Sequence, residues 1–484
     1  MTHFKAPLII RGRILEDDDA EFGGRNAETR FRGPDVAKYV NELPLSPPSA
    51  LADLYELSFE QILDYLEELG QRLRFTTNTH LQQALELTTR TSGLGEPILR
   101  ACYENLGAVF NRHEMRQMAD ILIGIPYLEG WVKTRSENGS TSYVRAFGAR
   151  SMHIIAGNVP TISAITVMRN AITRSDMIVK TPSNDPLTAC AIARTMIDMA
   201  PDHPITRHLS VGYWKGGDAR IEGVLYQPRN IEKIIAWGGM ASVTHIAKYI
   251  QPGIDLITLD PKLSSTIIGR EAFADAETMR EVARRAALDV AVNNQQACLN
   301  ARVIYIQTGT DKAGLETANR FGKMLYDAIQ DLPVHLSNPV RALDSALAQE
   351  MEGLRFAASA YKVYGGDGKG GVIVSQMDEP VEFSPLLANR VANLVPVDDL
   401  EVPIRAVTAY TQTIGIYPDS LMPEIRDRLS FHGAQRLVTL GGATKRTIAG
   451  PQDGIEVMRR ICKWILNEVH DPQVVSPRDV RRAS

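Results

Sequence analysis

The feature that most constrains the fold is an alternation, from Ser151 onward, of short apolar runs with stretches long enough for a helix. The apolar runs of the first block lie at 152–156, 177–180, 208–212, 234–237 and 255–259. A second block has a helix predicted over 271–292, a strand at 303–306 and a helix over 311–329. This alternation is typical of parallel strands joined by crossover helices. Since 484 residues are too many for one ordinary core, we predict an α/β protein with two lobes.

Composition narrows the class of partner. The chain is 44% hydrophobic and 23% charged with a formal net charge of −4, which gives no electrostatic footprint for nucleic acid or an anionic membrane. No apolar run reaches the roughly 18 residues of a membrane span. The four cysteines, at 102, 190, 298 and 462, suggest neither a disulfide framework nor a zinc site, and we find no leader segment. We therefore expect a cytoplasmic protein that acts on small molecules.

The segments around the two blocks have patterns of their own. Residues 1–45 are rich in charge, glycine and proline and are predicted to be loosely structured, whereas Ser58-Phe59-Glu60-Gln61 has the sequence of a capping box and opens a helical region. Asn138-Gly139 predicts a β-hairpin. We expect a flexible connection near the active site at 365–371, whose glycines lack phosphate-loop spacing, and a terminal helix over 454–469.

One cysteine is distinguished by its neighbours. The run Asn293-Asn294-Gln295-Gln296-Ala297-Cys298 leads into the predicted strand at 303–306. Asn and Gln offer hydrogen-bond donors without fixed charge, so a thiol there is placed to attack a carbonyl while N–H groups hold the oxyanion that forms. A lone cysteine is more often a small buried hydrophobe. The amide-rich context favours a nucleophile at Cys298.

Other polar residues follow strands of the first block. Gly157-Asn158 and Gly238-Gly239 each join a predicted strand to a helix, and Lys180 ends a strand, at the edge where ligands bind in open α/β sheets. The Asn158 amide suits an oxyanion, and a glycine before a helix lets a phosphate approach backbone N–H groups. Each feature also has a structural interpretation, as a turn or a solvated lysine, and no GxGxxG fingerprint is present.

Four motifs in order carry a resemblance to a known family. They are Gly-Asn-x-Pro at 157–160, Val-Lys-Thr-Pro-Ser at 179–183, the strand followed by glycine at 234–239, and Gln-x-x-Cys at 295–298. In this order they resemble the aldehyde dehydrogenase superfamily, and within it the LuxC-like acyl-CoA reductases that form long-chain aldehyde. The resemblance runs from about 131 to 469. It implies two Rossmann-like α/β lobes, one for the cofactor and one catalytic, plus an oligomerisation β-hairpin arm.

The resemblance also implies a division of the chain. Residues 1–130 are the helical N-terminal part of the cofactor lobe, 131–147 the oligomerisation hairpin, 148–260 the cofactor-binding lobe, 261–450 the catalytic lobe, and 451–484 a C-terminal helix and oligomerisation strand. An exposed hairpin leaves a strand edge that a symmetric partner covers, so a homo-oligomer is expected.

Carried over residue by residue, the resemblance assigns roles. Cys298 matches the nucleophile, and Asn158 with the Cys298 backbone N–H matches the oxyanion hole. Lys180 matches the lysine that contacts the adenosine ribose. Gly238 and Gly239 lie where the cofactor phosphates approach.

Three further positions bear on the cofactor and on the direction of reaction. Ser183 stands where NAD-preferring members often carry glutamate, and because only a carboxylate would repel a 2′-phosphate, NADPH is expected, with NADH as the other option. Glu382 resembles the glutamate that holds the nicotinamide ribose, in a segment one residue short. Asp260 stands where aldehyde oxidisers have a glutamate base, and is either a shorter substitute or a turn residue. A weak base favours reduction, since the acyl intermediate must not be hydrolysed before hydride reaches it.

These matches predict reduction of an acyl-CoA or other acyl thioester, of long chain, to aldehyde through a thioester on Cys298. Cys298 is expected to titrate below the roughly 8.5 of a free thiol, and His153 and His432 are expected to be structural. Two other functions stay open: NAD-dependent aldehyde oxidation, with a base at Asp260 or elsewhere, and a non-reducing acyl carrier for a partner acyl-protein synthetase. The sequence leaves open the chain length and the donor, whether CoA, adenylate or acyl-protein.

Overall fold

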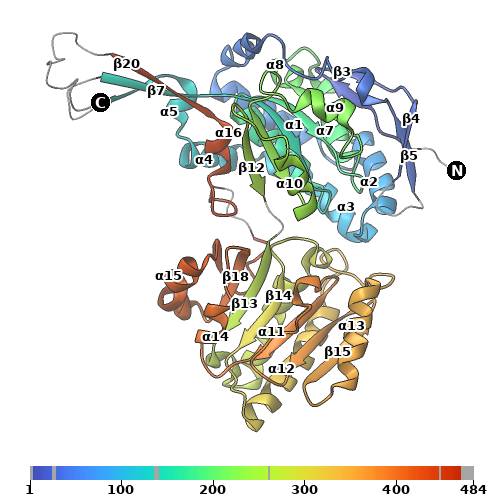
Figure 1. Ribbon diagram of the computed structural model, residues 1–484, viewed down its shortest axis with the longest axis vertical. Helices are drawn as coiled ribbons and strands as arrows, with labels where there is room; N and C mark the ends of the chain where they lie inside the picture. The colour runs from blue at the N-terminus through green and yellow to red at the C-terminus, as the bar shows by residue number, and fades with distance from the viewer. Residues whose placement is uncertain (1–3, 24–28, 136–140, 260–261, 446–448, 470–484) are drawn as a thin grey trace.

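The computed structural model describes residues 4–23, 29–135, 141–259, 262–445 and 449–469. They form two seven-stranded sheets, which lie in separate lobes one above the other in Figure 1, and two three-stranded sheets. Among these residues no helix is long and apolar enough to cross a membrane. The predicted α/β fold with two lobes is confirmed.

The first sheet contains the strands predicted from the first block. Its order is β12, β11, β8, β9, β10, β2 and β3, of which the first five are parallel. The bounds in that order are Asp255–Leu259, Lys233–Trp237, Arg150–Ile154, Asp176–Lys180, Leu209–Gly212, Leu8–Ile10 and Arg13–Leu15. Because β8, β9 and β11 are parallel neighbours, the segments that follow them leave the same edge of the sheet.

The second sheet has the order β15, β16, β17, β14, β13, β18 and β19. The bounds in that order are Tyr361–Asp367, Gly370–Ser375, Val391–Pro396, Ala301–Ile306, Leu263–Ile268, Thr411–Tyr417 and Arg436–Thr439. All but the β15–β16 pair are parallel. The small sheets have the orders β1, β5, β4 (Phe4–Lys5, Arg30–Gly33, Ala20–Gly23) and β20, β7, β6 (Lys463–Val469, Thr141–Phe147, Val132–Arg135).

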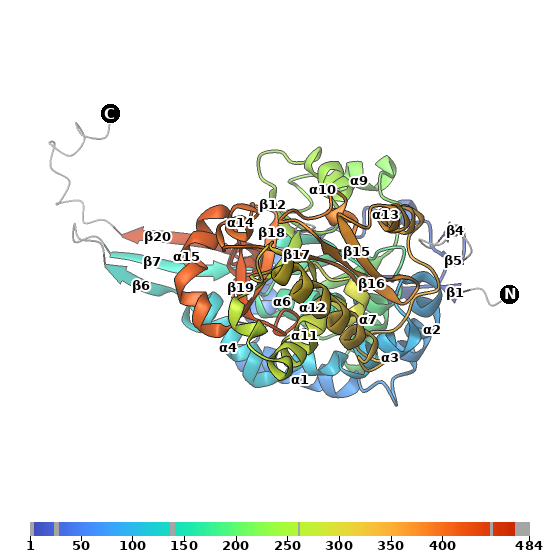
Figure 2. The ribbon, with the colours of Figure 1, turned by 90° about the horizontal axis from the view of Figure 1, so that it is seen from below.

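Helices pack on both faces of each large sheet. Those of the first lobe are α1 to α10: Phe59–Arg72, Thr79–Thr91, Glu96–Glu104, Arg112–Leu122, Ile125–Glu129, Thr161–Ile172, Thr188–Met199, Pro204–Arg207, Ala219–Leu225 and Met240–Ala247. The remaining helices are α11 to α16: Ala276–Ala291, Lys312–Gln330, Ser345–Phe356, Glu401–Arg405, Met422–His432 and Val457–Ile461. Figure 2 shows α11 and α12 side by side across the second sheet.

The first 45 residues differ from the prediction, because they contain five strands rather than a loose segment. Leu8, Ile9 and Ile10 are buried and pair antiparallel with β10. Arg11 then forms an ion pair with buried Asp176 at the start of β9. Three apolar residues between Pro7 and Arg11 are too short a pattern to predict a strand, and their partner lies some two hundred positions later.

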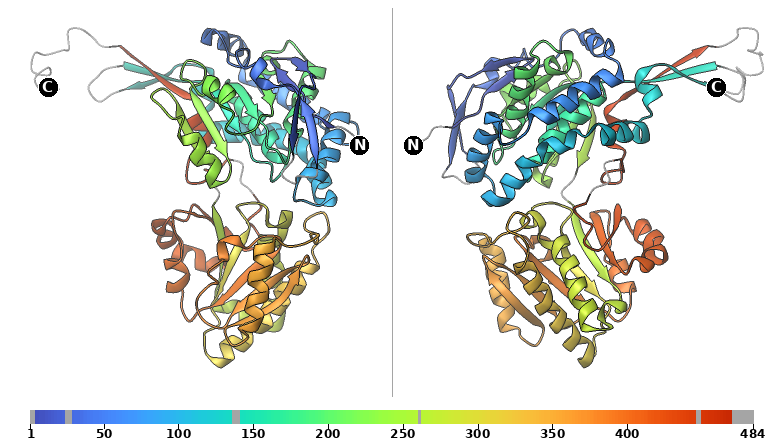
Figure 3. Two further views of the ribbon diagram at one scale, coloured as in Figure 1. Left: turned by 45° about the vertical axis from the view of Figure 1, so that its right-hand side comes forward. Right: turned by 180° about the vertical axis from the view of Figure 1, so that it is seen from behind.

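The C-terminal segment also differs from the prediction. Of the expected helix over 454–469, only Val457–Ile461 is helical, and Lys463–Val469 is the strand β20. It pairs with β7 without a break, from Lys463 opposite Phe147 to Val469 opposite Thr141. With β6, these strands form an arm that projects from the upper lobe in Figure 3. The strands of the predicted hairpin are therefore present, while Asn138-Gly139 lies outside the described residues.

Two smaller expectations were tested as well. The capping box at Ser58 is confirmed. The glycines at 365–371 belong to the β15–β16 pair at the sheet edge instead of forming a flexible connection. Helix α7 begins at Thr188, whose backbone N–H donates to the Asp185 carboxylate at 3.1 Å.

Candidate active site

The loop before Cys298 owes its shape to its amide residues. Asn293, Asn294 and Gln295 have φ values of 53°, 50° and 61°, in the left-handed region that asparagine tolerates better than most residues. The Asn294 side chain accepts from the backbone N–H of Asn338 at 2.9 Å, and the Gln295 amide donates to the carbonyls of Ala301 and Val391. These two side chains hold the loop through hydrogen bonds within the protein, and the oxyanion assignment stays with Asn158 and the Cys298 backbone N–H.

Cys298 lies half-buried where this loop meets the second sheet. Its carbonyl accepts from the Ser264 hydroxyl of β13 at 2.6 Å, and the Ser264 hydroxyl accepts from the backbone N–H of Thr413 at 3.1 Å. Asn300 closes the turn, since its side chain accepts from the Ala297 N–H and donates to the Val292 carbonyl. The position of the thiol is thus fixed by two neighbouring strands.

Burial keeps the other three cysteines protonated. Burial raises the pKa of Cys102 to about 11, and burial raises the pKa values of Cys190 and Cys462 to about 12. These three side chains therefore remain thiols at neutral pH, and no pair of the four forms a disulfide.

Asn158 meets the cysteine loop from the other lobe. It follows β8 and precedes α6, and its Nδ2 donates to the carbonyl of Gln296 at 3.1 Å. Its Oδ1 is buried and accepts no hydrogen bond from any described residue. Gly157 beside it is required, because a Cβ there would lie 2.3 Å from the Asn184 Oδ1. The structure thus brings together the loops of Asn158 and Cys298, which are far apart in sequence.

Lys180 and the two glycines lie at one edge of the first sheet. The Lys180 ammonium lies 5.7 Å from the ring centroids of both Tyr213 and Trp214. Burial lowers the pKa of Lys180 to about 8, and Glu222 opposes this shift, so Lys180 is not a solvated surface lysine. Gly239 caps α10 and has open space where a side chain would be.

The remaining predicted positions are less tightly placed. Ser183 is half-buried in the turn after β9, and Glu382 is exposed just before the short helix Ser384–Leu386. Asp260 lies outside the described residues. His153 is buried beside the Ser151 hydroxyl, and burial lowers its pKa to about 3, so its neutral, structural role is confirmed. His432 is exposed at the end of α15.

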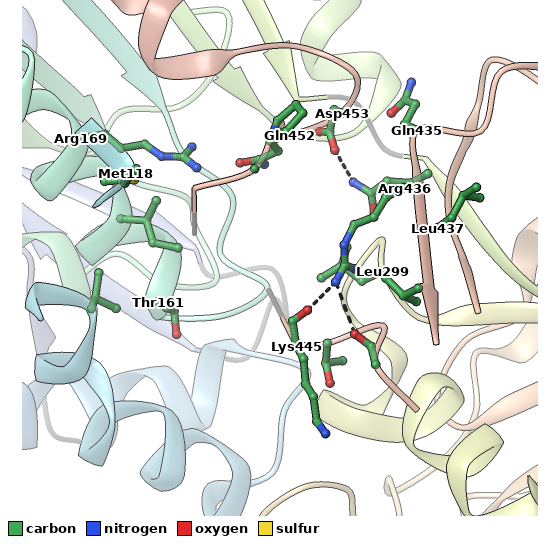
Figure 4. Close-up of a pocket in the computed structure, with 18 of the residues that line it drawn as sticks. Met118, Thr161, Arg169, Leu299, Gln435, Arg436, Leu437, Lys445, Gln452 and Asp453 are labelled. Atoms are coloured by element: carbon green, nitrogen blue, oxygen red, sulfur yellow. Dashed lines mark hydrogen bonds between the residues drawn. The ribbon is translucent and has the colours of Figure 1, made fainter. Parts of the chain in front are cut away.

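A cavity of about 650 Å³ lies between α6 and β19, with the segment 450–453 across it (Figure 4). One wall carries the apolar side chains of Val109, Met118, Ile165 and Met168 together with the polar side chains of Thr161 and Arg169. The opposite wall is polar and comes from Gln435, Arg436, Lys445, Gln452 and Asp453. Leu299, which follows Cys298, is part of the lining. The volume is within the range of roughly 300–1,000 Å³ that holds small ligands.

Residues 54–464 match the sequence model of the family described as Acyl-CoA reductase (LuxC). The chain belongs to this family. A long-chain acyl-protein thioester reductase of Photorhabdus luminescens is 30% identical to this LuxC-family chain over 85% of it and 83% of the relative. The protein of that name from Vibrio harveyi is 25% identical over 96% and 93%. The match to the Photorhabdus laumondii reductase spans 65% of that protein.

Solved structures support the fold. A salicylaldehyde dehydrogenase from Pseudomonas putida G7 superposes with a TM-score of 0.72 at 12% identity, over 98% of this chain and 100% of that one. An aldehyde dehydrogenase from Physcomitrella patens gives a TM-score of 0.70 at 12% identity. The predicted aldehyde dehydrogenase-like fold is confirmed, and family and fold together make this LuxC-family chain an aldehyde-forming oxidoreductase.

Sequence reasoning missed the cavity of this LuxC-family protein. Two of the four apolar residues on one wall, Ile165 and Met168, lie on α6, a helix that is buried nearly all round and so has no single apolar stripe. The polar wall depends on β19 and on a turn held by buried Asp289, whose carboxylate accepts from the N–H groups of Gly441 and Ala443. The glycine pair at 441–442 is the one signal of this turn in the sequence.

Proposed function

We propose that this LuxC-family protein reduces the acyl group of a long-chain acyl thioester to an aldehyde through a thioester on Cys298. The observation that carries the proposal is the contact of Asn158 Nδ2 with the cysteine loop, beside a cavity that begins at Leu299. Acyl transfer requires a thiol next to an amide donor, since the thiol attacks the carbonyl and the amide N–H holds the oxyanion.

The proposed reaction has three steps at Cys298. The Cys298 sulfur bonds to the carbonyl carbon of the donor, the donor thiolate leaves, and a proton converts it to a thiol. Hydride then adds to the acyl carbon, and the Asn158 amide with the Cys298 N–H holds the oxygen. The carbon–sulfur bond of Cys298 breaks, which releases aldehyde and returns the thiolate.

The first sheet has groups that fit a nicotinamide cofactor, which supplies hydride when bound. Lys180 brings a cation to the sheet edge, and Gly239 leaves open the start of α10, where N–H groups suit a phosphate. Ser183 has no charge to repel a 2′-phosphate, so we propose NADPH as the preferred reductant and NADH as the weaker one. Glu382 is proposed to hold the nicotinamide ribose, and Asp260 is proposed to be too short for an efficient base.

The wider assembly is also a proposal. We take 148–260 as the cofactor lobe and 261–450 as the catalytic lobe, with the first 130 residues packed on the former. The arm formed by β6, β7 and β20 exposes Ile465, Leu466 and Val469, which favours a homo-oligomer. Four cysteines without a disulfide fit a reducing cytoplasm. Because relatives are named acyl-protein thioester reductases, an acylated synthetase is the proposed donor, with acyl-CoA as a substitute.

The test is an intact-mass measurement. The protein is incubated with a long-chain acyl-CoA, weighed, and weighed again after NADPH is added. One acyl adduct that disappears with NADPH, and that does not form on Cys298→Ser, supports the proposal; Cys102→Ser is the matched control and should form the adduct. An adduct that persists with NADPH would support the acyl-carrier function, and an adduct on Cys298→Ser would reject this nucleophile. An acylated protein thioester is the second donor to try.

A further inference from the structure

Asp289 of α11 is a buried carboxylate that the proposed reaction does not use. Its two oxygens accept from the backbone N–H groups of Gly441 and Ala443, each at 2.9 Å. Gly415 of β18 leaves room for the carboxylate, because a Cβ there would lie 2.6 Å from Asp289 Oδ2 and 3.3 Å from the neutral Thr266 hydroxyl of β13. A buried charge is costly unless hydrogen bonds compensate it, so the two N–H groups stabilise the ionised form.

The turn that Asp289 holds is part of the polar wall of the cavity. Three residues of this turn line the cavity, namely Gly442, Thr444 and Lys445. Arg436 of β19 binds the same turn from its other side, since the guanidinium donates to the carbonyls of Ala443 at 2.6 Å and Gly442 at 3.3 Å. The turn is thus fixed by an anion at its N–H groups and by a cation at its carbonyl groups.

The backbone of Asp289 also supports the turn of the nucleophile. The Asn300 Nδ2 donates to the Asp289 carbonyl at 3.2 Å, and the Asn300 Oδ1 accepts at 3.1 Å from the N–H of Ala297, which precedes Cys298. One residue therefore contacts the cavity wall through its side chain and, through Asn300, the cysteine turn through its carbonyl.

Two cations act on the Asp289 carboxyl group. Burial raises the pKa of Asp289 to about 6, and the two N–H groups oppose the shift, as do the charges of Arg436 and Lys445. Arg285, one turn earlier on α11, is paired with Glu281 at 2.9 Å. A carboxyl group with a pKa of about 6 loses its charge within the range of pH in which enzymes are commonly measured.

We propose that Asp289 is a positioning residue for substrate binding, whose ionised carboxylate holds the cavity wall against the acyl group and whose protonation releases that wall. An ionised carboxylate accepts from both N–H groups, whereas protonation turns one oxygen into a hydroxyl donor that faces an N–H donor. The acyl group is then expected to bind more weakly in acid. This role rests on the proposed function, since it takes the cavity as the site of the acyl group.

The experiment measures the dissociation constant of dodecanamide, an uncharged analogue of a long-chain acyl group, by calorimetry from about pH 5 to about pH 8. The parent protein is Cys298→Ala, so that no thiol at 298 titrates. As the pH falls through about 6, binding should weaken about fivefold, because one hydrogen bond of the wall is lost. Asp289→Asn in this parent should bind equally at every pH, with the low-pH dissociation constant, since its amide N–H faces the N–H donor in the same way.

Asp275→Asn is the matched control on the same helix. The Asp275 carboxylate accepts from the N–H groups of Glu277 and Thr278 at 2.9 and 2.8 Å, but it is exposed and caps α11, a position that asparagine also suits. This variant should keep the pH dependence of the parent.

Three results would overturn the proposal: no binding of dodecanamide at any pH, equal binding by the parent across the range, or a pH dependence that survives in folded Asp289→Asn. If that variant does not fold, hydrogen exchange of the parent decides, because the Gly441 and Ala443 N–H groups must lose protection, relative to their intrinsic rates, as the pH falls through about 6. The mass of the Cys298 adduct tests the proposed function without any change of pH, so the two failures are distinguishable.

Discussion

Two buried polar regions, the Asp176 cluster and the surroundings of Cys298, differ in how far their groups satisfy one another. In the first lobe, Asp176 accepts from Arg11 Nη2 at 3.0 Å and contacts His208 at 2.9 Å, and His208 contacts Asp53 at 2.8 Å. Around Cys298, by contrast, Asn158 Oδ1 and Arg302 Nη1 are buried without a partner among the described residues. Groups that satisfy one another hold the architecture, whereas unused ones are available to atoms that arrive later.

The largest effect is expected from removing the Cys298 thiol. Cys298→Ala should lower aldehyde formation by about 10⁴-fold or more, because loss of a nucleophile removes the covalent route. Its melting temperature should stay close to that of the wild type, since the side chain is half-buried and small. Steady-state NADPH oxidation and thermal unfolding measure both, and retained turnover would place the reaction elsewhere.

The next largest effect should come from breaking the satisfied cluster. Arg11→Met leaves the Asp176 charge buried, and it should cost about 3–5 kcal/mol of unfolding free energy, measured by urea denaturation. Arg13→Met is the control, because its ion pair with Glu42 is exposed and should contribute under about 1 kcal/mol. Equal losses of unfolding free energy in the two variants would show that the buried ion pair contributes no more than the exposed one.

The same cluster gives a dependence on pH. Burial would raise the pKa of Asp176, but hydrogen bonds from His208 and Arg11 outweigh it, and the net pKa is lowered. A lowered carboxyl pKa contributes stability to the folded state above about pH 4. This stability is lost as the pH falls through the pKa that the carboxyl group has in the folded state. The stability gap between wild type and Arg11→Met should therefore narrow below about pH 4 and be constant near neutrality.

A smaller effect is expected from the amide that spans the lobes. Asn158→Ala should lower kcat by about 10²–10³-fold with little change in KM, because the oxyanion forms only during reaction. Asn319→Ala removes a comparable amide on α12, whose Nδ2 donates to the Gln376 side chain at 3.0 Å. This variant should leave kcat unchanged. A loss confined to KM would show that Asn158 binds the ground state instead.

The smallest effect concerns cofactor choice. Ser183→Glu should lower the ratio of kcat/KM for NADPH over NADH about five- to tenfold, since a new carboxylate repels a 2′-phosphate by about 1 kcal/mol in a wet site. Ser183→Gln adds similar bulk without charge and should change the ratio little. The same ratio in both variants would mean that charge at this position does not select the cofactor.

The sequence predicted what depends on local pattern. Parallel strands and the hairpin strands follow from apolar runs and from residues at strand ends, whereas the meeting of the Asn158 and Cys298 loops was implied by the resemblance to the family. The strand Leu8–Ile10 was missed because distant β10 decides it, and β20 was mistaken for a helix because Ile461, Trp464 and Ile465 also fit a helical spacing. Asp289 was missed because the N–H groups that it binds lie some 150 positions later in the chain.

The arm has a consequence for the order of synthesis. Residues 141–147 leave the ribosome more than three hundred residues before their partners at 463–469, and a two-stranded hairpin alone is marginal in water. The edge of β7 that pairs with β20 therefore stays without that partner strand until almost the whole chain has been synthesised. Joining of subunits through this arm would then be restricted to chains that have been translated through residue 469, so truncated products would be kept out of the assembly.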